Sequence, residues 1–178
     1  MSKGFILWLT GLPASGKTTI ALKLKDILSS RGLKVEVLDG DEVRRWLSPE
    51  EKFSREDRER HLRRVAYVSM LLARNDVIVL ASFVSPYRNI RNEARRLAED
   101  NKVKFVEVYV KCSLETCMKR DPKGLYGKAL RNEIKDMTGL QDIYEEPLNP
   151  EIIVDTEKDS LEECVKKILD RLRDMGMI

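Results

Sequence analysis

The chain has 178 residues, with 33 Lys and Arg against 30 Asp and Glu, so its formal net charge is only +3. This length fits one domain with a single core, and the near balance of charge does not point to nucleic-acid binding. The first apolar run is too short to span a membrane and leads directly into a glycine-rich loop, and three cysteines without metal-site spacing favour free thiols in a reducing cytoplasm. We therefore expect one domain over residues 1–178, cytoplasmic, with neither a signal peptide nor a membrane segment.

Short apolar runs alternate with longer amphipathic segments along the chain. The runs predict strands at 5–10, 35–38, 77–82, 103–110 and 151–155, and the segments predict helices at 17–31, 42–47, 55–74, 87–100, 114–120 and 160–174. This alternation predicts a three-layer α/β fold in which a parallel five-stranded sheet carries helices on both faces. Residues 121–150 are rich in Gly, Pro and charge and have poor periodicity, which is typical of a mobile lid.

Residues 11–18 read GLPASGKT and lie between the first strand and the first helix. This pattern is the P-loop, in which Gly11 and Gly16 let backbone N–H groups surround phosphate oxygens, Lys17 reaches the β- and γ-phosphates, and Thr18 binds Mg²⁺. The alternative is a glycine-rich turn before an ordinary helix, but the flanking strand and helix favour the P-loop. The nucleotide-binding residues expected here are Gly11, Leu12, Pro13, Ala14, Ser15, Gly16, Lys17, Thr18 and Thr19.

Asp39 and Asp41 follow the second predicted strand and so are expected at the ligand-binding end of the sheet. One carboxylate could hold Mg²⁺, and the other could accept the proton of an attacking hydroxyl. Alone, this D-G-D sequence could equally be a turn and helix N-cap. Beside a P-loop, the catalytic interpretation is favoured, with Lys17, Asp39 and Asp41 as the catalytic residues and Thr18 and Asp39 as the metal ligands.

The third predicted strand ends in SFVSPYR and lacks the Asp of a Walker B strand, which argues against motor and switch ATPases. Phe83 in this segment and Phe53 could stack on a base or could be core residues. The stretch 55–64 mixes arginines with acids, so a solvated helix face is as good a reading as a binding site. Arg58 is its strongest candidate for a ligand contact.

A series of segments in fixed order resembles the adenylylsulfate kinase family over nearly the whole chain. They are GLPASGKT, LDGDEVR, KFSREDR, SFVSPYR, FVEVYV, RDPKGLYGKA, TGL and YEEPLNPE. The resemblance implies a P-loop NTPase-type fold and transfer of the γ-phosphoryl group of ATP to the 3′-hydroxyl of adenosine 5′-phosphosulfate (adenylylsulfate), in sulfate assimilation. It also implies Mg²⁺, a homodimer and a functional association with ATP sulfurylase.

The resemblance also implies roles for individual residues. Asp41 would act at the acceptor hydroxyl, and Arg120 would contact the ATP adenine. The substrate-binding residues would be Asp41, Arg44, Phe53, Arg58, His61, Phe83, Val84, Ser85, Lys123 and Leu125. Within this set, Arg44 and Arg58 would bind the phosphosulfate while Phe53 and Phe83 sandwich the adenine; Lys123 could instead be a solvated loop lysine. Ser85 matches a serine that is phosphorylated in some relatives, although Ser-Pro is also a common turn at a strand end.

Two departures from the family pattern bear on the acceptor. His61 stands where Asn is usual, and Met137 and residues 143–147 differ from the usual lid sequence. On a helix, His61 and Arg58 share a face, so we expect His61 to point toward the acceptor and, titrating near pH 6.5, to strengthen acceptor binding as the pH falls from about 8 to 6. The alternative is a histidine that faces solvent.

Two other functions compete with this one. The chain could be another small-metabolite kinase, such as a gluconate or nucleoside monophosphate kinase, although SFVSPYR and DPKGLY argue against it. It could also be a nonenzymatic sensor that binds adenylylsulfate-type ligands, although a sensor would more readily have a degraded P-loop.

Overall fold

Five parallel strands form the sheet in the computed structural model, which describes residues 4–178. The strands are β1 (Phe5–Thr10), β2 (Val35–Asp39), β3 (Ile78–Ser82), β4 (Lys104–Lys111) and β5 (Ile152–Asp155), in the spatial order β2-β3-β1-β4-β5. The helices are α1 (Lys17–Ser30), α2 (Gly40–Leu47), α3 (Arg55–Arg74), α4 (Arg88–Asp100), α5 (Leu114–Arg120), α6 (Leu125–Leu130) and α7 (Leu161–Asp174). The predicted α/β fold with a parallel five-stranded sheet is confirmed.

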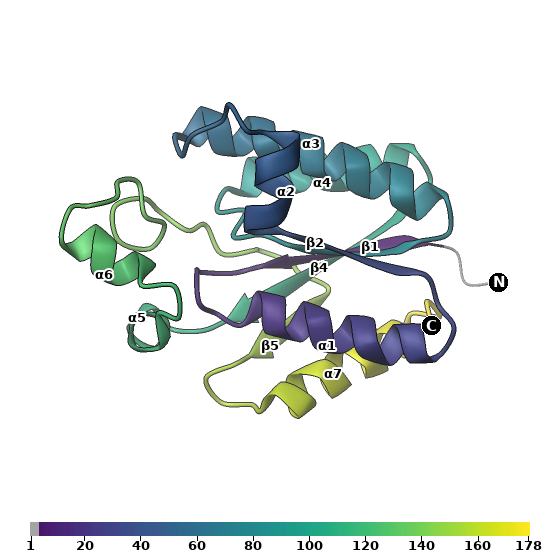
Figure 1. The fold of residues 1–178 in the computed structure, drawn as a ribbon. Helices are drawn as coiled ribbons and strands as arrows, with labels where there is room; N and C mark the ends of the chain where they lie inside the picture. The colour runs from purple at the N-terminus through teal and green to yellow at the C-terminus, as the bar shows by residue number, and fades with distance from the viewer. Residues whose placement is uncertain (1–3) are drawn as a thin grey trace.

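Helices cover both faces of the sheet. Figure 1 shows α1 and α7 on one face and α2, α3 and α4 on the other, with α5 and α6 beyond one end of the sheet. Because β1 is central and pairs with β3 and β4, all six of its residues are buried. This explains why FILWLT has no polar alternation.

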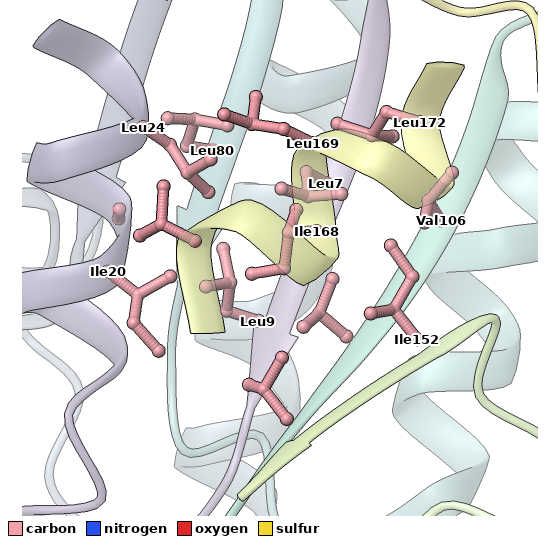
Figure 2. Packing of buried hydrophobic residues seen from close by; sticks show 14 of the residues in the cluster. Leu7, Leu9, Ile20, Leu24, Leu80, Val106, Ile152, Ile168, Leu169 and Leu172 are labelled. Carbon is pink, nitrogen blue, oxygen red and sulfur yellow. The ribbon is translucent and has the colours of Figure 1, made fainter. Parts of the chain in front are cut away.

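The core on the α1/α7 face packs aliphatic side chains from helices and strands together. Ile20 and Leu24 of α1 meet Ile168 and Leu172 of α7 above Leu7 of β1 (Figure 2). Each fully buried side chain of this size contributes roughly 1.5–3 kcal/mol to folding. A second buried cluster lies on the opposite face, so the sheet is held between two apolar layers and its strand ends are fixed in place.

The segment predicted to be a mobile lid has more structure than the sequence indicates. It contains α6, which was not predicted, and a small apolar cluster of its own in which Tyr126 and Met137 pack near Leu12 of the P-loop. The Tyr126 hydroxyl also donates a hydrogen bond to the Pro13 carbonyl at 2.9 Å. The first part of the lid is therefore packed against the loop that it would cover.

The end of the same segment is hydrogen-bonded to β1 and to residues 86–88, which follow β3. The Glu145 amide donates to the Pro86 carbonyl at 2.8 Å, and the Glu145 carboxylate accepts from the Arg88 amide at 2.7 Å. The Tyr144 hydroxyl shares a hydrogen bond with Thr10 Oγ1 at 2.8 Å. These bonds connect the end of the predicted lid, at Tyr144 and Glu145, to β1 and to residues 86–88, and the mobility of 121–150 stays a prediction.

Two general expectations can be compared with the described residues. Cys112, Cys117 and Cys164 are all free and buried. Within residues 4–178, no helix is both long enough and apolar enough to cross a membrane.

Candidate active site

One cavity of about 800 Å³ opens at the carboxyl ends of the strands. It is lined by the P-loop, by α2 and α3, by the segment after β3, by the lid and by the loop between β5 and α7. All residues that the sequence assigns to the site line this cavity except Gly11, Leu12 and Ser15, which belong to the P-loop behind it. Segments far apart in the sequence therefore meet in one space.

The P-loop glycines stand where another residue would not fit. Gly16 has φ of 97°, in the left-handed region that favours glycine, and it immediately precedes α1. A Cβ atom on Gly11 would lie 2.5 Å from the Val110 carbonyl oxygen of β4. The loop can therefore turn tightly from β1 into α1, whose first N–H groups form an anion-binding end.

Lys17 is almost fully buried at the start of α1. Its Nζ atom donates to the carbonyl oxygens of Gly11 at 3.0 Å and Leu12 at 2.7 Å. Burial lowers the pKa of Lys17 to about 8, and the neighbouring Asp39 partly opposes this change. A bound triphosphate would supply negative charge beside Nζ and favour the protonated form, so nucleotide binding above pH 8 should be accompanied by proton uptake.

Thr18 and Asp39 offer adjacent oxygen ligands. The Thr18 hydroxyl donates to Asp39 Oδ1 at 3.1 Å. Within residues 4–178, no group of three or more His, Cys, Asp or Glu side chains is arranged to hold a metal ion. A hydroxyl and a single carboxylate fit Mg²⁺, which keeps several waters and takes phosphate oxygens as further ligands. They do not fit a zinc site.

Asp41 lies at the start of α2 and faces the lid. Its Oδ2 atom accepts a hydrogen bond from Lys123 Nζ at 2.5 Å, and both side chains are exposed. This contact raises the pKa of Lys123, so the ammonium is retained. Lys123 thus spans from the lid to the carboxylate expected to act as base while its side chain stays exposed to solvent.

The two aromatic residues proposed to hold the acceptor base differ in burial. Phe53 is 59% exposed, and the Arg44 guanidinium lies over its ring at 5.1 Å from the centroid. Phe83 is only 5% exposed, and its ring packs against Trp8 and His61 with centroids 6.1 and 5.7 Å away. Phe83 is thus both a cavity wall and a core residue, whereas Phe53 is held at the rim.

The expectation that His61 titrates near pH 6.5 is wrong, as is the alternative of a solvent-facing side chain. His61 is 1% exposed, and its Nδ1 atom shares a hydrogen bond with Ser48 Oγ at 2.8 Å. Burial, aided by the positive charges of Arg44 and Arg64, lowers the pKa of His61 to about 4. The ring lines the cavity in its neutral form, and its Nε2 atom is buried without a hydrogen-bond partner among the described residues.

Ser85 lies in the cavity wall with its hydroxyl already engaged. It is 2% exposed and has a positive φ of 40°. Its Oγ atom accepts from Trp8 Nε1 at 3.0 Å and donates to the Phe83 carbonyl at 3.3 Å. Phosphorylation would replace the hydroxyl hydrogen that Ser85 donates to the Phe83 carbonyl, so the environment favours a structural role that holds the turn after β3.

Arg120 ends α5 beside the P-loop. It donates to both oxygens of Thr156, to Oγ1 at 3.0 Å and to the carbonyl at 2.6 Å, while Thr156 Oγ1 donates to the Ser15 carbonyl at 2.8 Å. Thr156, together with Asp159 and Leu161, lines the nucleotide end of the cavity and was not predicted. The sequence did hold a signal for it, because Thr156 directly follows β5 and ligands gather at the carboxyl ends of parallel strands.

The fold and the site together define a P-loop phosphotransferase: a glycine loop with a buried lysine, a hydroxyl and carboxylate pair, and room for an acceptor in the same cavity. A family model described as adenylylsulphate kinase matches residues 3–155. A probable adenylyl-sulfate kinase from Aeropyrum pernix is 53% identical over 165 residues, which is 93% of this chain and 90% of the relative. The chain belongs to the adenylylsulphate kinase family.

Two further relatives add detail. The APS kinase CysC of Mycobacterium tuberculosis, whose structure was solved in complex with AMPPNP and APS, is 36% identical with a TM-score of 0.94, covering 97% of this chain and 99% of that chain. A probable bifunctional SAT/APS kinase 2 from Sorangium cellulosum is 46% identical over 175 residues, which is 98% of this chain and 29% of the relative.

Proposed function

We propose that the protein transfers the γ-phosphoryl group of ATP to the 3′-hydroxyl of adenylylsulfate, giving 3′-phosphoadenosine 5′-phosphosulfate and ADP. The observation that carries this proposal is that one continuous cavity joins the buried Lys17 of the P-loop to an acceptor end formed by Arg44, Arg58 and two aromatic rings. An acceptor with a flat base and several anionic oxygens matches aromatic faces and guanidinium groups.

Catalysis at this site is mainly positioning and charge stabilisation. The backbone of the P-loop and Lys17 would hold the β- and γ-phosphates, and Asp41 would accept the proton of the 3′-hydroxyl as it attacks in line. Thr18 and Asp39 would hold Mg²⁺, which neutralises charge on the phosphates when bound. Lys123, which is paired with Asp41 in this structure, would contact the acceptor.

The acceptor would be bound between segments that only the fold brings together. Phe53 and Phe83 would stack on the adenine, while Arg44 and Arg58 bind the phosphosulfate. Because His61 is neutral, it would not attract the acceptor by charge. Its unpaired Nε2 atom would instead form a hydrogen bond with the acceptor. Val84, Ser85 and Leu125 would complete the wall, and Arg120 would contact the ATP adenine.

The direct test is to incubate the protein with ATP, Mg²⁺ and adenylylsulfate and to measure ADP formation. We expect ADP only when the acceptor is present, and we expect Lys17→Ala to lose nearly all of this activity. Parallel reactions with gluconate and with nucleoside monophosphates test the competing kinases. Tight binding of adenylylsulfate without ADP formation would identify a sensor and overturn the proposal.

Four wider expectations concern assembly, location, a partner and a modification. We propose a homodimer located in the cytoplasm, which sedimentation and fractionation would test. The relative whose name joins SAT and APS kinase in one chain supports a functional association with ATP sulfurylase. A pull-down with a purified sulfurylase would test that association. Phosphorylation of Ser85 stays a prediction, to be tested by mass spectrometry of the protein after turnover.

A further inference from the structure

The lid turn at residues 136–142 forms hydrogen bonds with the guanidinium group of Arg58. Arg58 Nη1 donates to Thr138 Oγ1 at 2.6 Å and to Asp142 Oδ2 at 3.1 Å, and Nη2 donates to the Asp136 carbonyl. The turn is closed by its own backbone, since the Gly139 amide donates to the Asp142 carbonyl at 2.7 Å. Arg58 is thus bound by a segment about 80 residues further along the chain.

These hydrogen bonds leave some N–H donors of the guanidinium group available for a ligand. Of its five N–H donors, the two on Nη1 and one on Nη2 are used, while the Nε donor and the second Nη2 donor have no partner among residues 4–178. A guanidinium with two donors to spare can still bind an oxyanion. The turn therefore orients Arg58 without using all of its N–H donors.

Asp142 also fixes the guanidinium to the body of the protein. Its Oδ2 atom accepts from the hydroxyl of Tyr87, a buried residue that precedes α4, as well as from Arg58. The Arg55 guanidinium lies 4.2 Å from the centroid of the Tyr87 ring. One carboxylate therefore links the lid, α3 and the start of α4.

The charge of Asp142 also matters at the acceptor end. Burial and the nearby Arg58 lower the pKa of Arg44, so the two guanidinium groups are close enough to repel each other. The ion pair between Arg58 and Asp142 is largely shielded, with side chains 11% and 26% exposed. The Asp142 carboxylate therefore pairs with one of the two guanidinium groups at this end of the cavity.

We propose that Asp142 is a positioning residue for acceptor binding, which holds the Arg58 guanidinium in the cavity through a carboxylate shared with Tyr87. The inference rests on the proposed function in that Arg58 binds the acceptor. Asp142 acts through Arg58, so its loss should weaken acceptor binding without changing nucleotide binding or the chemical step.

The test compares Asp142→Asn with Glu133→Gln. Both remove one negative charge from the lid, but Glu133 pairs only with Arg131 at the surface. We expect Asp142→Asn to raise the KM for adenylylsulfate on the order of tenfold, as for loss of a charged hydrogen bond, with kcat within about threefold and the KM for ATP unchanged. Glu133→Gln should match the wild type.

A double-mutant cycle separates positioning from general support of the fold. In the Arg58→Ala background, Asp142→Asn should raise the KM for adenylylsulfate no further. Tyr87→Phe, which removes one arm of the link but no charge, should give a smaller rise than Asp142→Asn and serves as the second variant if Asp142→Asn does not fold.

Three results would overturn the inference while ADP formation by the wild type keeps the proposed function intact. They are equal KM values for Asp142→Asn and Glu133→Gln, additive effects of Asp142→Asn and Arg58→Ala, and an Arg58→Ala variant with unchanged KM for adenylylsulfate. Absence of acceptor-dependent ADP formation in the wild type would instead overturn the proposed function, and with it the assignment of Arg58.

Discussion

The two ends of the cavity are built in different ways. The phosphate site at the nucleotide end is formed by residues 11–18, a continuous stretch that runs from β1 into α1 and includes the buried Lys17. The acceptor end is assembled from α2, α3, the segment after β3 and the lid, and its ring Phe53 is exposed. The difference indicates that local backbone geometry builds the phosphate site, whereas long-range contacts build the acceptor site.

The largest effect is expected at the nucleotide end. Lys17→Ala should lower kcat/KM by roughly 10²–10³-fold or more, as for loss of a donor that stabilises developing charge. The protein should stay folded, because the change removes a buried charge rather than an apolar contact. Turnover assays with a thermal melt check both statements, and turnover within a few-fold of the wild type would disprove the P-loop assignment.

A smaller but still large effect is expected where the two ends meet. Asp41→Asn keeps the shape of the side chain but removes the proton acceptor, so kcat should fall on the order of 10²-fold or more with nucleotide affinity largely preserved. Steady-state kinetics and ATP titration measure the two quantities separately. Weaker ATP binding with unchanged kcat would show that Asp41 belongs to the metal site.

The aromatic pair sharpens the contrast within the acceptor end. Loss of either ring should raise the KM for adenylylsulfate. The expected loss of binding free energy is about 1–3 kcal/mol, the usual value for a base stacked on an aromatic face. Phe83→Ala should also destabilise the fold by roughly 3–5 kcal/mol because Phe83 packs against Trp8, whereas Phe53→Ala should stay within about 0.5 kcal/mol. Unfolding curves and kinetics on both variants test this, and an unchanged KM would make Phe83 a core residue alone.

The smallest effect on binding concerns His61. Its pKa of about 4 in the fold lies below the ordinary 6.5, so it is neutral at every pH where the enzyme would be assayed. Acceptor affinity should therefore be nearly flat between pH 8 and 6, in the wild type and in His61→Asn alike. An affinity that rises toward pH 6 only in the wild type would restore the titrating histidine.

The same pKa has a consequence for stability. Between about pH 6.5 and 4, His61 binds a proton in the unfolded chain but not in the folded chain. Its contribution to the free energy of unfolding is therefore complete above pH 6.5 and is lost as the pH falls toward 4. The free energy of unfolding should fall by roughly 3 kcal/mol over this range because of His61, and this part of the fall should be missing in the His61→Asn variant. Urea unfolding of both proteins across this range measures the difference.

Much of the protein could be predicted from local patterns. The roles of most acceptor-site residues come from the family resemblance. The five strands, the six predicted helices, the phosphate site and the pair Asp39 and Asp41 follow from apolar runs, amphipathic segments, the P-loop spacing and carboxylates at the end of β2. These features depend on residues close together in the chain. Helix α6 was missed because its six residues, LYGKAL, are too few for a helical period to stand out from a Gly-rich segment.

The sequence by itself determined the class of fold, the phosphate site and the chemistry of the acceptor residues. Only the tertiary structure decided that His61 is neutral, that the Ser85 hydroxyl is bound to Trp8, and that Arg58 is held by Asp142. The physical reason is that a backbone turn is set by its own residues. Burial, by contrast, and with it the charge state and hydrogen bonds of a side chain, depends on atoms that the sequence places tens of residues away.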